Sequence, residues 1–514
     1  MSSFYDVILN DEEEDLQSRK NMDKWIFRLL LLLLGVMPLI VLANVEEVIS
    51  PLISNVDVLS SGTKGDLFTH YKALFLLVIT IIVSGMFLTK IFFMNGTVKK
   101  TFLNYVLGAF VIVIVVSTVL SPNITTALNG QYNRSEGAII WLCYIALVFV
   151  AMNIEYPKKV ITYIMYAMMP VVYINLYIMT MNFYGNDLLQ KEWLQKLVSI
   201  ALPEGASISA NSQLLGTLNQ WNYMSGMFAM MTVMYLAWAV IAKKWYESVM
   251  GVITASAAVA IMLMATSTNG FLTLVCVLPF ILWLAIKSIS KKRAVAVLLT
   301  FFVVMAASLH TLSLQNEKVW AESVGFFLSG NNPYSQEQPV EGALESKDEL
   351  SLSIFKHKVS ASDNAFELPT LPESAWGPGT GRIYIWKETL ELVADRPLFG
   401  YGLDSLVYHF PHYQLEARAN MNEETVVDKP HNVYVGVLFG TGIIGLLALI
   451  VFALYMCKDI FINIKKGNDV SILAILCLAF LIQALFNDTT PAIMCTFFVL
   501  AGIVLAKSNN LKKE

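Results

Sequence analysis

The chain has 514 residues, of which 56% are hydrophobic and only 14% charged, and its formal net charge is −4. Soluble domains carry about 25% charged residues, so this composition excludes an ordinary soluble globular protein. The apolar residues gather in runs of about 17–25 residues, the length with which a helix crosses a bilayer. The sequence therefore predicts an all-α, polytopic membrane protein.

We expect about twelve transmembrane helices. The predicted spans are 26–44, 72–94, 101–120, 138–153, 159–180, 222–241, 247–265, 270–287, 294–312, 432–456, 469–487 and 490–507. An acidic tail with the run DEEED at 11–15 precedes the first span. That span has full crossing length and no defensible cleavage site, so we interpret it as a membrane helix and not as a signal peptide.

The distribution of lysine and arginine predicts the orientation of the chain. Every even-numbered connection is basic, as in Lys99–Lys100, Lys158–Lys159, Lys243–Lys244, Lys291–Lys292–Arg293 and Lys465–Lys466. The short odd-numbered connections carry only Lys64, Lys72 and Arg134. Because basic loops stay in the cytoplasm, both termini are expected there. The predicted divisions are a cytoplasmic tail at 1–25, helices 1–9 at 26–312, a long extracytoplasmic loop at 313–430, helices 10–12 at 431–507 and a cytoplasmic tail at 508–514.

Ionised residues are expected to be nearly absent from the spans. Ion-coupled transporters usually keep charged groups inside the bundle, whereas here only Asp488, beside Asn487, stands at an outer helix end. Broken helices do not recur in matching positions of two halves, as they do in many transporters. A transporter is therefore the weaker hypothesis.

No cofactor or metal site is predicted. The residues from Gly440 to Gly445 fit the dinucleotide pattern G-x-G-x-x-G, but no strand precedes them, so we interpret the glycines as sites of close helix packing. Adjacent acidic pairs such as Glu423–Glu424 do not face one another on a helix. The five cysteines lie in or beside apolar runs, which argues against a disulfide framework.

The long loop has two parts. Residues 313–375 are rich in Asn, Ser, Glu and Pro, and we expect them to be irregular. From Trp376 the chain reads WGPGTGRIYIWKETLELV, in which apolar residues recur at helical spacing: Ile383, Trp386, Leu390 and Val393. The loop is therefore expected to carry one short amphipathic helix, with this face against the bundle or the membrane.

Two residues of this region are candidates for chemistry. Arg382 begins the amphipathic helix, where free backbone N–H groups favour a phosphate and the guanidinium fork can hold two phosphate oxygens. His431 stands at the start of the tenth span, placed to act as a base or hydrogen-bond partner. Each residue also has a purely structural interpretation. Arg382 could extend its side chain to lipid headgroups, and His431 could anchor a helix end at the membrane interface.

Four motifs together resemble the O-antigen ligase and polysaccharide polymerase superfamily. They are GQYNRSEG at 130–137, GTLNQWNY at 216–223, GRIYIWKETLELVADRPLFGYGLDSL at 381–406 and HNVYVGVLFGTGIIGL at 431–446. Their order, and the long loop before the third-last span, also fit, and the resemblance covers about residues 110–450. It implies a membrane glycosyltransferase that moves an oligosaccharide from an undecaprenyl-diphosphate carrier to an acceptor hydroxyl on the outer face.

The resemblance also nominates site residues. Arg134 and Arg382 become the cations near the donor diphosphate, and His431 becomes the group that orients or deprotonates the acceptor hydroxyl. The candidates for substrate binding are Gly381, Trp386, Asn219, Asn222 and Asn432. Many members carry an arginine after the seventh span where this chain has Asn269, and Arg396 or Lys387 are the candidate substitutes.

The implied partners are the lipid-linked donor, a glycan, lipid or protein acceptor, and membrane lipids, without nucleic acid. Two arginines neutralise a leaving diphosphate without a metal. A ligase and a polymerase use the same donor, so the sequence leaves them open. A lipid-linked glycan flippase or polysaccharide exporter has a similar span count and is the alternative function, and a non-catalytic assembly scaffold is a third.

Overall fold

The computed structural model describes residues 2–54, 56–209, 212–218, 220–328, 332–335, 381–421 and 425–510, except for the side chains of 2–11, 418 and 509–510. Asn219, most of the stretch 313–375 that we expected to be irregular, and the glycine-rich start at Trp376 lie outside the described residues.

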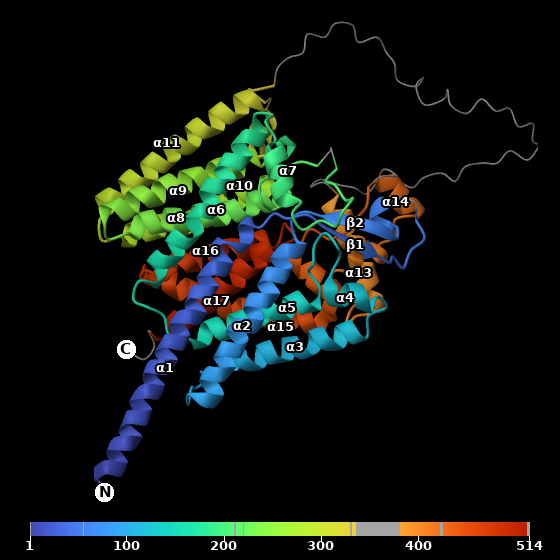
Figure 1. Ribbon diagram of the computed structural model, residues 1–514. Coiled ribbons are helices and arrows are strands. Elements are labelled where there is room, and N and C mark those ends of the chain that lie inside the picture. The colour runs from blue at the N-terminus through green and yellow to red at the C-terminus, as the bar shows by residue number, and fades with distance from the viewer. Residues whose placement is uncertain are drawn as a thin grey trace, which may run out of the picture.

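Long helices account for most of the described chain (Figure 1). They are α1 (Ser2–Gly35), α2 (His70–Phe93), α3 (Phe102–Val119), α5 (Ala138–Asn153), α6 (Val160–Phe183), α8 (Trp221–Ile241), α9 (Trp245–Met264), α10 (Thr268–Lys287), α11 (Lys291–Gln315), α15 (Val433–Lys466), α16 (Ser471–Gln483) and α17 (Pro491–Asn510). The short helices are α4 (Ile124–Asn129), α7 (Glu192–Val198), α12 (Lys318–Ala321), α13 (Arg382–Asp395) and α14 (Leu415–Asn420).

The predicted all-α, polytopic membrane fold is confirmed. Within the described ranges a helix covers all or part of each of the twelve predicted spans. Of these, 9 are both long and apolar enough to cross a membrane, while α5 and α16 are apolar but shorter. The total of twelve crossings therefore stays a prediction.

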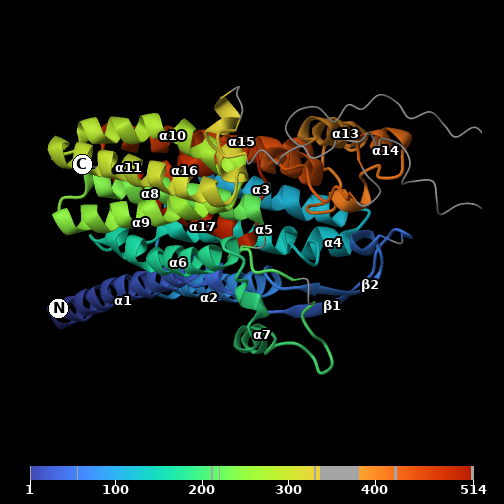
Figure 2. The same ribbon diagram turned by 90° about the horizontal axis from the view of Figure 1, so that it is seen from above.

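The first predicted span differs from the structure at both ends. Helix α1 starts at Ser2, so the acidic run is helical, as its many good helix formers allow. The helix ends at Gly35, shortly before Pro38, because proline cannot continue a helix. The next residues form strand β1 (Asn44–Val48), which pairs antiparallel with β2 (Gly62–Asp66). Figure 2 shows this hairpin at the end of the bundle away from the N-terminus.

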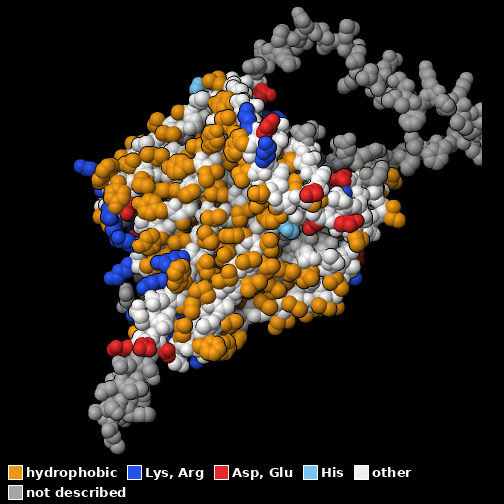
Figure 3. All heavy atoms as spheres, viewed as in Figure 1, with side chains coloured by type: hydrophobic (Ala, Val, Ile, Leu, Met, Phe, Trp, Pro, Cys, Tyr) orange, Lys and Arg blue, Asp and Glu red, His pale blue; other side chains and the backbone are white. Residues whose placement is uncertain are grey.

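Helix α8 forms the centre of the bundle. Every residue from Tyr223 to Ile241 is buried, and α9, α10, α11 and α16 pack around it. The outermost helices show the reverse pattern: on α11, Val295, Leu299 and Val303 are 53%, 62% and 67% exposed. A broad band of hydrophobic side chains therefore covers the bundle in Figure 3, as expected of a surface that contacts lipid.

Charged side chains are more frequent on the helices than expected, and that prediction is wrong. Lys90 of α2 and Asp23 of α1 form a buried ion pair at 2.6 Å. Lys72 is 2% exposed and donates to three backbone carbonyl oxygens, those of Ile40, Phe68 and Thr217, at 2.6, 2.6 and 2.8 Å. These contacts satisfy buried charge locally, which a hydropathy pattern does not reveal.

Helix α15 is interrupted at Gly442, whose φ of 67° and ψ of −171° are not helical. The break frees backbone groups, and the preceding loop pairs with them. Tyr401 and Gly402 donate their N–H groups to the carbonyl oxygens of Phe439 and Gly440 at 3.0 and 2.9 Å, and Ile443 donates to Pro397 at 2.8 Å. Gly440 and Gly442, which we interpreted as helix-packing sites, thus pack against a loop, whereas Gly445 faces Val113 of α3.

We predict that Gly442→Ala destabilises the protein strongly. A Cβ here would lie 2.3 Å from the carbonyl carbon of Leu398, and the positive φ adds strain that typically costs about 1–3 kcal/mol. Gly436→Ala is the matched control, because its Cβ would meet nothing closer than 3.6 Å. Thermal unfolding in detergent measures both. Equal melting temperatures for the two variants would contradict this account of the break.

Candidate functional site

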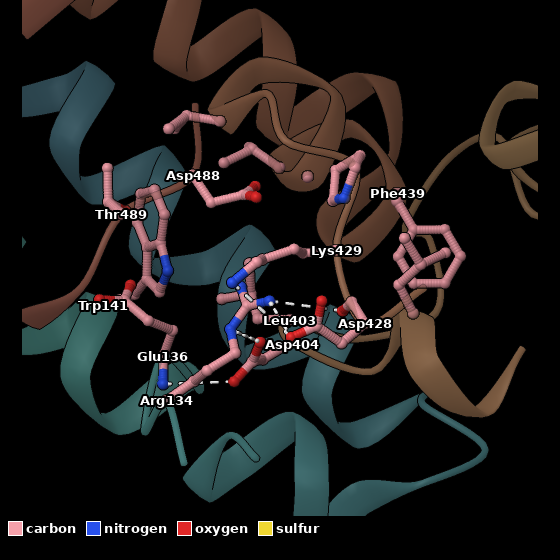
Figure 4. A pocket seen from close by; sticks show the side chains of 15 residues that line it. Arg134, Glu136, Trp141, Leu403, Asp404, Asp428, Lys429, Phe439, Asp488 and Thr489 are labelled. Carbon is pink, nitrogen blue, oxygen red and sulfur yellow. Dashed lines mark hydrogen bonds and ion pairs between the residues drawn. The ribbon is translucent and has the colours of Figure 1, made fainter. Parts of the chain in front are cut away.

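Ionisable side chains gather at the end of the bundle that carries α13 and α14. A small cavity of about 50 Å³ lies there, and its charged lining residues are Arg134, Glu136, Asp404, Asp428, Lys429 and Asp488. Figure 4 shows them converging from four separate parts of the chain: the connection before α5, the loop after α13, the segment before α15 and the segment before α17.

Arg134 is held between two carboxylates. Its Nε lies 2.9 Å from Oδ1 of Asp404, and its Nη1 lies 3.8 Å from Oδ2 of Asp428 (Figure 4). The N–H of Gln131 donates to Asp404 at 2.8 Å. Burial disfavours the charged guanidinium, but the negative charge of Asp404 above all outweighs burial, and the pKa of Arg134 is raised. Arg134 is therefore a permanently charged, firmly oriented group.

Lys429 is a second buried cation, which the sequence analysis missed. It is 4% exposed, and its Nζ lies 2.8 Å from Oη of Tyr223, 3.2 Å from Oε1 of Gln220 and 3.7 Å from Oδ2 of Asp428. Tyr223 and Gln220 belong to the motif at 216–223. Lys429 thus joins that motif to the segment that leads into α15.

His431 and Asp488 form a pair at the same place. Nδ1 of His431 lies 3.1 Å from Oδ2 of Asp488, and the histidine side chain is 27% exposed while the aspartate is 6% exposed. Burial acts to raise the pKa of Asp488, but contact with His431 and the charges of Arg134 and Lys429 outweigh it, and this pKa is lowered. An ionised carboxylate therefore faces the imidazole.

Asn432 fixes the backbone beside this pair. Its Oδ1 caps α15 by accepting from the N–H groups of Tyr434 and Val435 at 2.9 and 3.1 Å, and its Nδ2 donates to the carbonyl of Leu485 at 3.0 Å. The amide of this predicted substrate-binding residue is thus engaged by the protein. His431 itself has a φ of 53°, a conformation that non-glycine residues hold only when their surroundings impose it.

Helix α13 brings Arg382 to the site, although its buried face differs from the predicted one. The buried residues are Tyr384, Ile385, Glu388, Thr389 and Val393. Ile383 and Leu390 are 55% and 48% exposed, so these two residues of the predicted apolar face do not pack on the bundle, whereas Val393 does. The helix packs on α15 and on the cluster around Phe410 and Phe439 through the neighbouring face, and this tertiary contact overrides the apolar periodicity.

The first turn of α13 is tied to the segment of His431. Nε1 of Trp386 donates to the carbonyl of Pro430 at 2.6 Å, and Gly381 caps the helix with a φ of 74°. Nε of Arg382 is buried without a hydrogen-bond partner in the described part of the chain. Burial lowers the pKa of Arg382, and the negative charges of Asp488 and Glu322 act against this shift. The negative charge of Asp488 thus acts on all three predicted catalytic residues, and His431 is the one in contact with it.

The place of the absent arginine holds a network of uncharged groups. The carbonyl oxygen of Asn222 accepts from Nδ2 of Asn269 at 3.2 Å and from Nδ2 of Asn487 at 3.1 Å, and its Oδ1 accepts from Oγ of Ser267 at 2.7 Å. Asn222, a predicted substrate-binding residue, therefore joins the start of α8 to the start of α10 and to the segment before α17. Asn269 contributes an amide to this structural network and no charge.

Neither proposed substitute for that arginine lines the cavity. Nη1 of Arg396 donates to the carbonyl of Leu120 at 3.0 Å, and its guanidinium lies over the ring of Tyr401. Lys387 is 65% exposed and pairs with Glu391 at 3.6 Å. The cation present in the cavity besides Arg134 is Lys429.

Four of the charged cavity residues were not predicted, although each lies within or beside a quoted motif. Glu136 closes the motif at 130–137, Asp404 lies in YGLDSL, and Asp428 and Lys429 directly precede Pro430. These residues could have been predicted because acidic residues stand close in sequence to the nominated cations and to His431. Among the described residues, no group of three or more His, Cys, Asp or Glu side chains is arranged to hold a metal ion.

Glu136 generates a prediction about pH. It accepts from Oη of Tyr144 at 2.9 Å, and burial raises its pKa from 4.5 to about 8. Between these values the folded protein holds a proton that the unfolded chain releases, so stability falls as pH rises from 4.5 to 8. We expect Glu136→Gln to weaken this dependence, as measured by melting temperature from pH 5 to 8. An unchanged slope would show that Glu136 is ionised in the folded protein.

Part of the chain is similar to a known protein family. Residues 252–450 match the family model described as O-Antigen ligase, a segment that contains α13, Arg382, Asp404, Lys429 and His431. No curated protein matches the chain. The resemblance seen in the sequence is thereby confirmed: the chain is a multi-pass membrane protein, and its residues 252–450 are similar to the O-antigen ligase family.

Proposed function

We propose that this protein transfers an oligosaccharide from undecaprenyl diphosphate to an acceptor hydroxyl, in the synthesis of a cell-envelope polysaccharide. The observation that carries the proposal is the contact between His431 and Asp488, next to Arg382, whose Nε has no partner in the described chain. The family supports the class of enzyme. The carrier and the acceptor are part of the proposal.

His431 is the proposed base. With Nδ1 bearing its proton toward the Asp488 carboxylate at 3.1 Å, the lone pair of the imidazole is on Nε2. A carboxylate in this position fixes the tautomer and stabilises the imidazolium that forms when Nε2 takes a proton. Because the histidine side chain is 27% exposed, an acceptor hydroxyl can reach it.

The proposed reaction is a single displacement at the anomeric carbon. The acceptor oxygen forms a bond to that carbon while the bond from the carbon to the diphosphate oxygen breaks. Undecaprenyl diphosphate leaves with the electron pair, and the hydroxyl proton passes to Nε2 of His431. The step requires no oxidant, reductant or metal for its balance.

Arg382 is the proposed partner of the departing diphosphate. Its guanidinium stays charged despite burial, it stands at the N-terminal end of α13, and a helix N-terminus favours an anion. Arg134 and Lys429 are already paired with carboxylates. Their proposed role is to hold fixed, preorganised positive groups at the cavity wall, which stabilise negative charge that develops in the transition state.

The proposed location of the reaction is the outer face of the membrane. The lysines of the connections after α5 and α8 lie together at the end of the bundle remote from the cavity, since α8 starts at the site with Tyr223 and ends beside Lys243. Basic connections favour the cytoplasm. This supports both termini on the cytoplasmic side and the cavity on the opposite side.

We expect His431→Gln to lower the transfer rate by about 10²–10⁴-fold, the usual contribution of a general base. Glutamine keeps a hydrogen-bonding side chain but takes up no proton. His310→Gln is the control, because His310 is exposed on α11. Product formation by purified protein is the measurement. A His431→Gln variant that is folded and fully active would exclude this histidine as the base.

For Arg382→Ala we expect a loss of about 10²–10³-fold, comparable to removal of one preorganised donor, with partial recovery in Arg382→Lys. Lys387→Ala is the matched control on the same helix, since this lysine is 65% exposed. Rates measured with saturating lipid-linked donor test this. Equal activity of the Arg382→Ala and Lys387→Ala variants would mean that the diphosphate contacts another cation.

A further inference from the structure

Two adjoining cavities, which we call the basic groove, lie at the end of the bundle remote from the candidate site. Their volumes are about 590 and 540 Å³. Both are lined by Ile241, Lys243, Asp469, Val470 and Lys507, which belong to the ends of α8 and α17 and the start of α16. The residues shared by the two cavities therefore come from the ends of three membrane helices.

The lining of the basic groove is strongly positive. Its lysines are Lys158, Lys159, Lys243, Lys244, Lys287 and Lys507, and its acidic residues are Asp469 and Glu247. Lys243 and Asp469 are 4.0 Å apart, and their side chains are 68% and 65% exposed, so this pair neutralises little charge. Figure 3 shows Lys and Arg side chains gathered at this end of the molecule.

Lys507 is the central cation of the groove, because it lines both cavities. It is half-buried, and its Nζ lies 5.9 Å from the centre of the Tyr156 ring. No carboxylate of the described residues lies within ion-pair distance of it. A cation that is partly removed from water without an acidic partner is costly unless an anion from outside completes it.

The walls favour a lipid over a free anion. Tyr163, Tyr166, Trp238 and Tyr246 line the cavity of about 540 Å³, and aromatic side chains of this kind prefer the headgroup layer of a membrane. Next to them the flank of α9 exposes Val249 and Ile253 by 43% and 52%, which offers an apolar surface for acyl chains. Basic pockets between membrane helices are known to bind the headgroups of acidic lipids.

We propose that the basic groove binds the phosphate of an anionic phospholipid, with Lys507 and Lys244 as its principal contacts. This site is separate from the transfer site and does not depend on the proposed function. Lipid bound there holds the ends of α6, α8, α9 and α17 together, and it stabilises the folded protein more as the lipid concentration rises above its dissociation constant.

The test compares melting temperatures in mixed micelles that contain either phosphatidylglycerol or phosphatidylcholine. We expect phosphatidylglycerol to raise the melting temperature of the unmodified protein, and the double variant K244Q/K507Q to lose most of that rise. K465Q/K466Q is the matched control: it removes two lysines from the C-terminal end of α15 that do not line the groove, and it should keep the rise.

Three outcomes would overturn the proposal: equal stabilisation of both variants by phosphatidylglycerol, no difference between the two lipids, or an equal rise with inorganic phosphate. If K244Q/K507Q does not fold, the surface variant K159Q/K244Q replaces it. It removes two exposed groove lysines, and a smaller rise than in K465Q/K466Q is then the expected result.

Discussion

The site depends on the interruption of α15 at Gly442. An unbroken helix would satisfy its own backbone, whereas this break leaves carbonyl and N–H groups to which the loop at 397–402 is hydrogen-bonded. Oγ of Ser117, on α3, donates to the carbonyl of Gly440 at 2.5 Å. Oγ of Ser121, two residues after the end of α3, donates to the carbonyl of Tyr401 at 2.5 Å. The loop is thereby fixed, and Asp404 at its end meets Arg134.

Around that fixed loop, opposite charges are arranged alternately. Asp404 and Asp428 flank Arg134, Asp428 also lies near Lys429, and Asp488 contacts His431. Each of these buried ions thus has a partner of opposite charge, which is the condition for keeping a charge away from water. Three non-glycine residues with positive φ, Ser135, Asp404 and His431, hold this arrangement, and strain of this kind is typical of functional sites.

The membrane helices could be predicted from the sequence because hydrophobic runs report directly on lipid contact. The motif residues Arg134, Arg382 and His431 could also be nominated. The face of α13 that packs on the protein could not be predicted from the sequence. Packing against α15 buries Tyr384 and Ile385, while Ile383 and Leu390 stay exposed. Likewise the glycines at 440–445 are compatible with close helix packing and with a helix break. The hydrogen bonds of the loop at 397–402 stabilise the break, and the sequence does not reveal them.

Lys429 and Asp488 show the same limit for the site. Each is a single charged residue in the sequence, and its place in the site depends on contacts with residues far away in the chain. Lys429 contacts Gln220 and Tyr223, and Asp488 contacts His431. Local spacing carries no information about such contacts. Cations in the cavity are therefore better identified from their buried carboxylate partners than from a family position such as Asn269.

The central claim is that this site performs covalent chemistry and does not transport a glycan. The most direct measurement incubates purified protein in detergent with one lipid-linked repeat, first alone and then with a second acceptor. The account predicts release of undecaprenyl diphosphate together with a longer glycan or a glycan–acceptor product, without vesicles or an ion gradient. A product ladder from the repeat alone would assign a polymerase, and product only with the acceptor would assign a ligase. A folded protein that forms no product in either case would contradict the account.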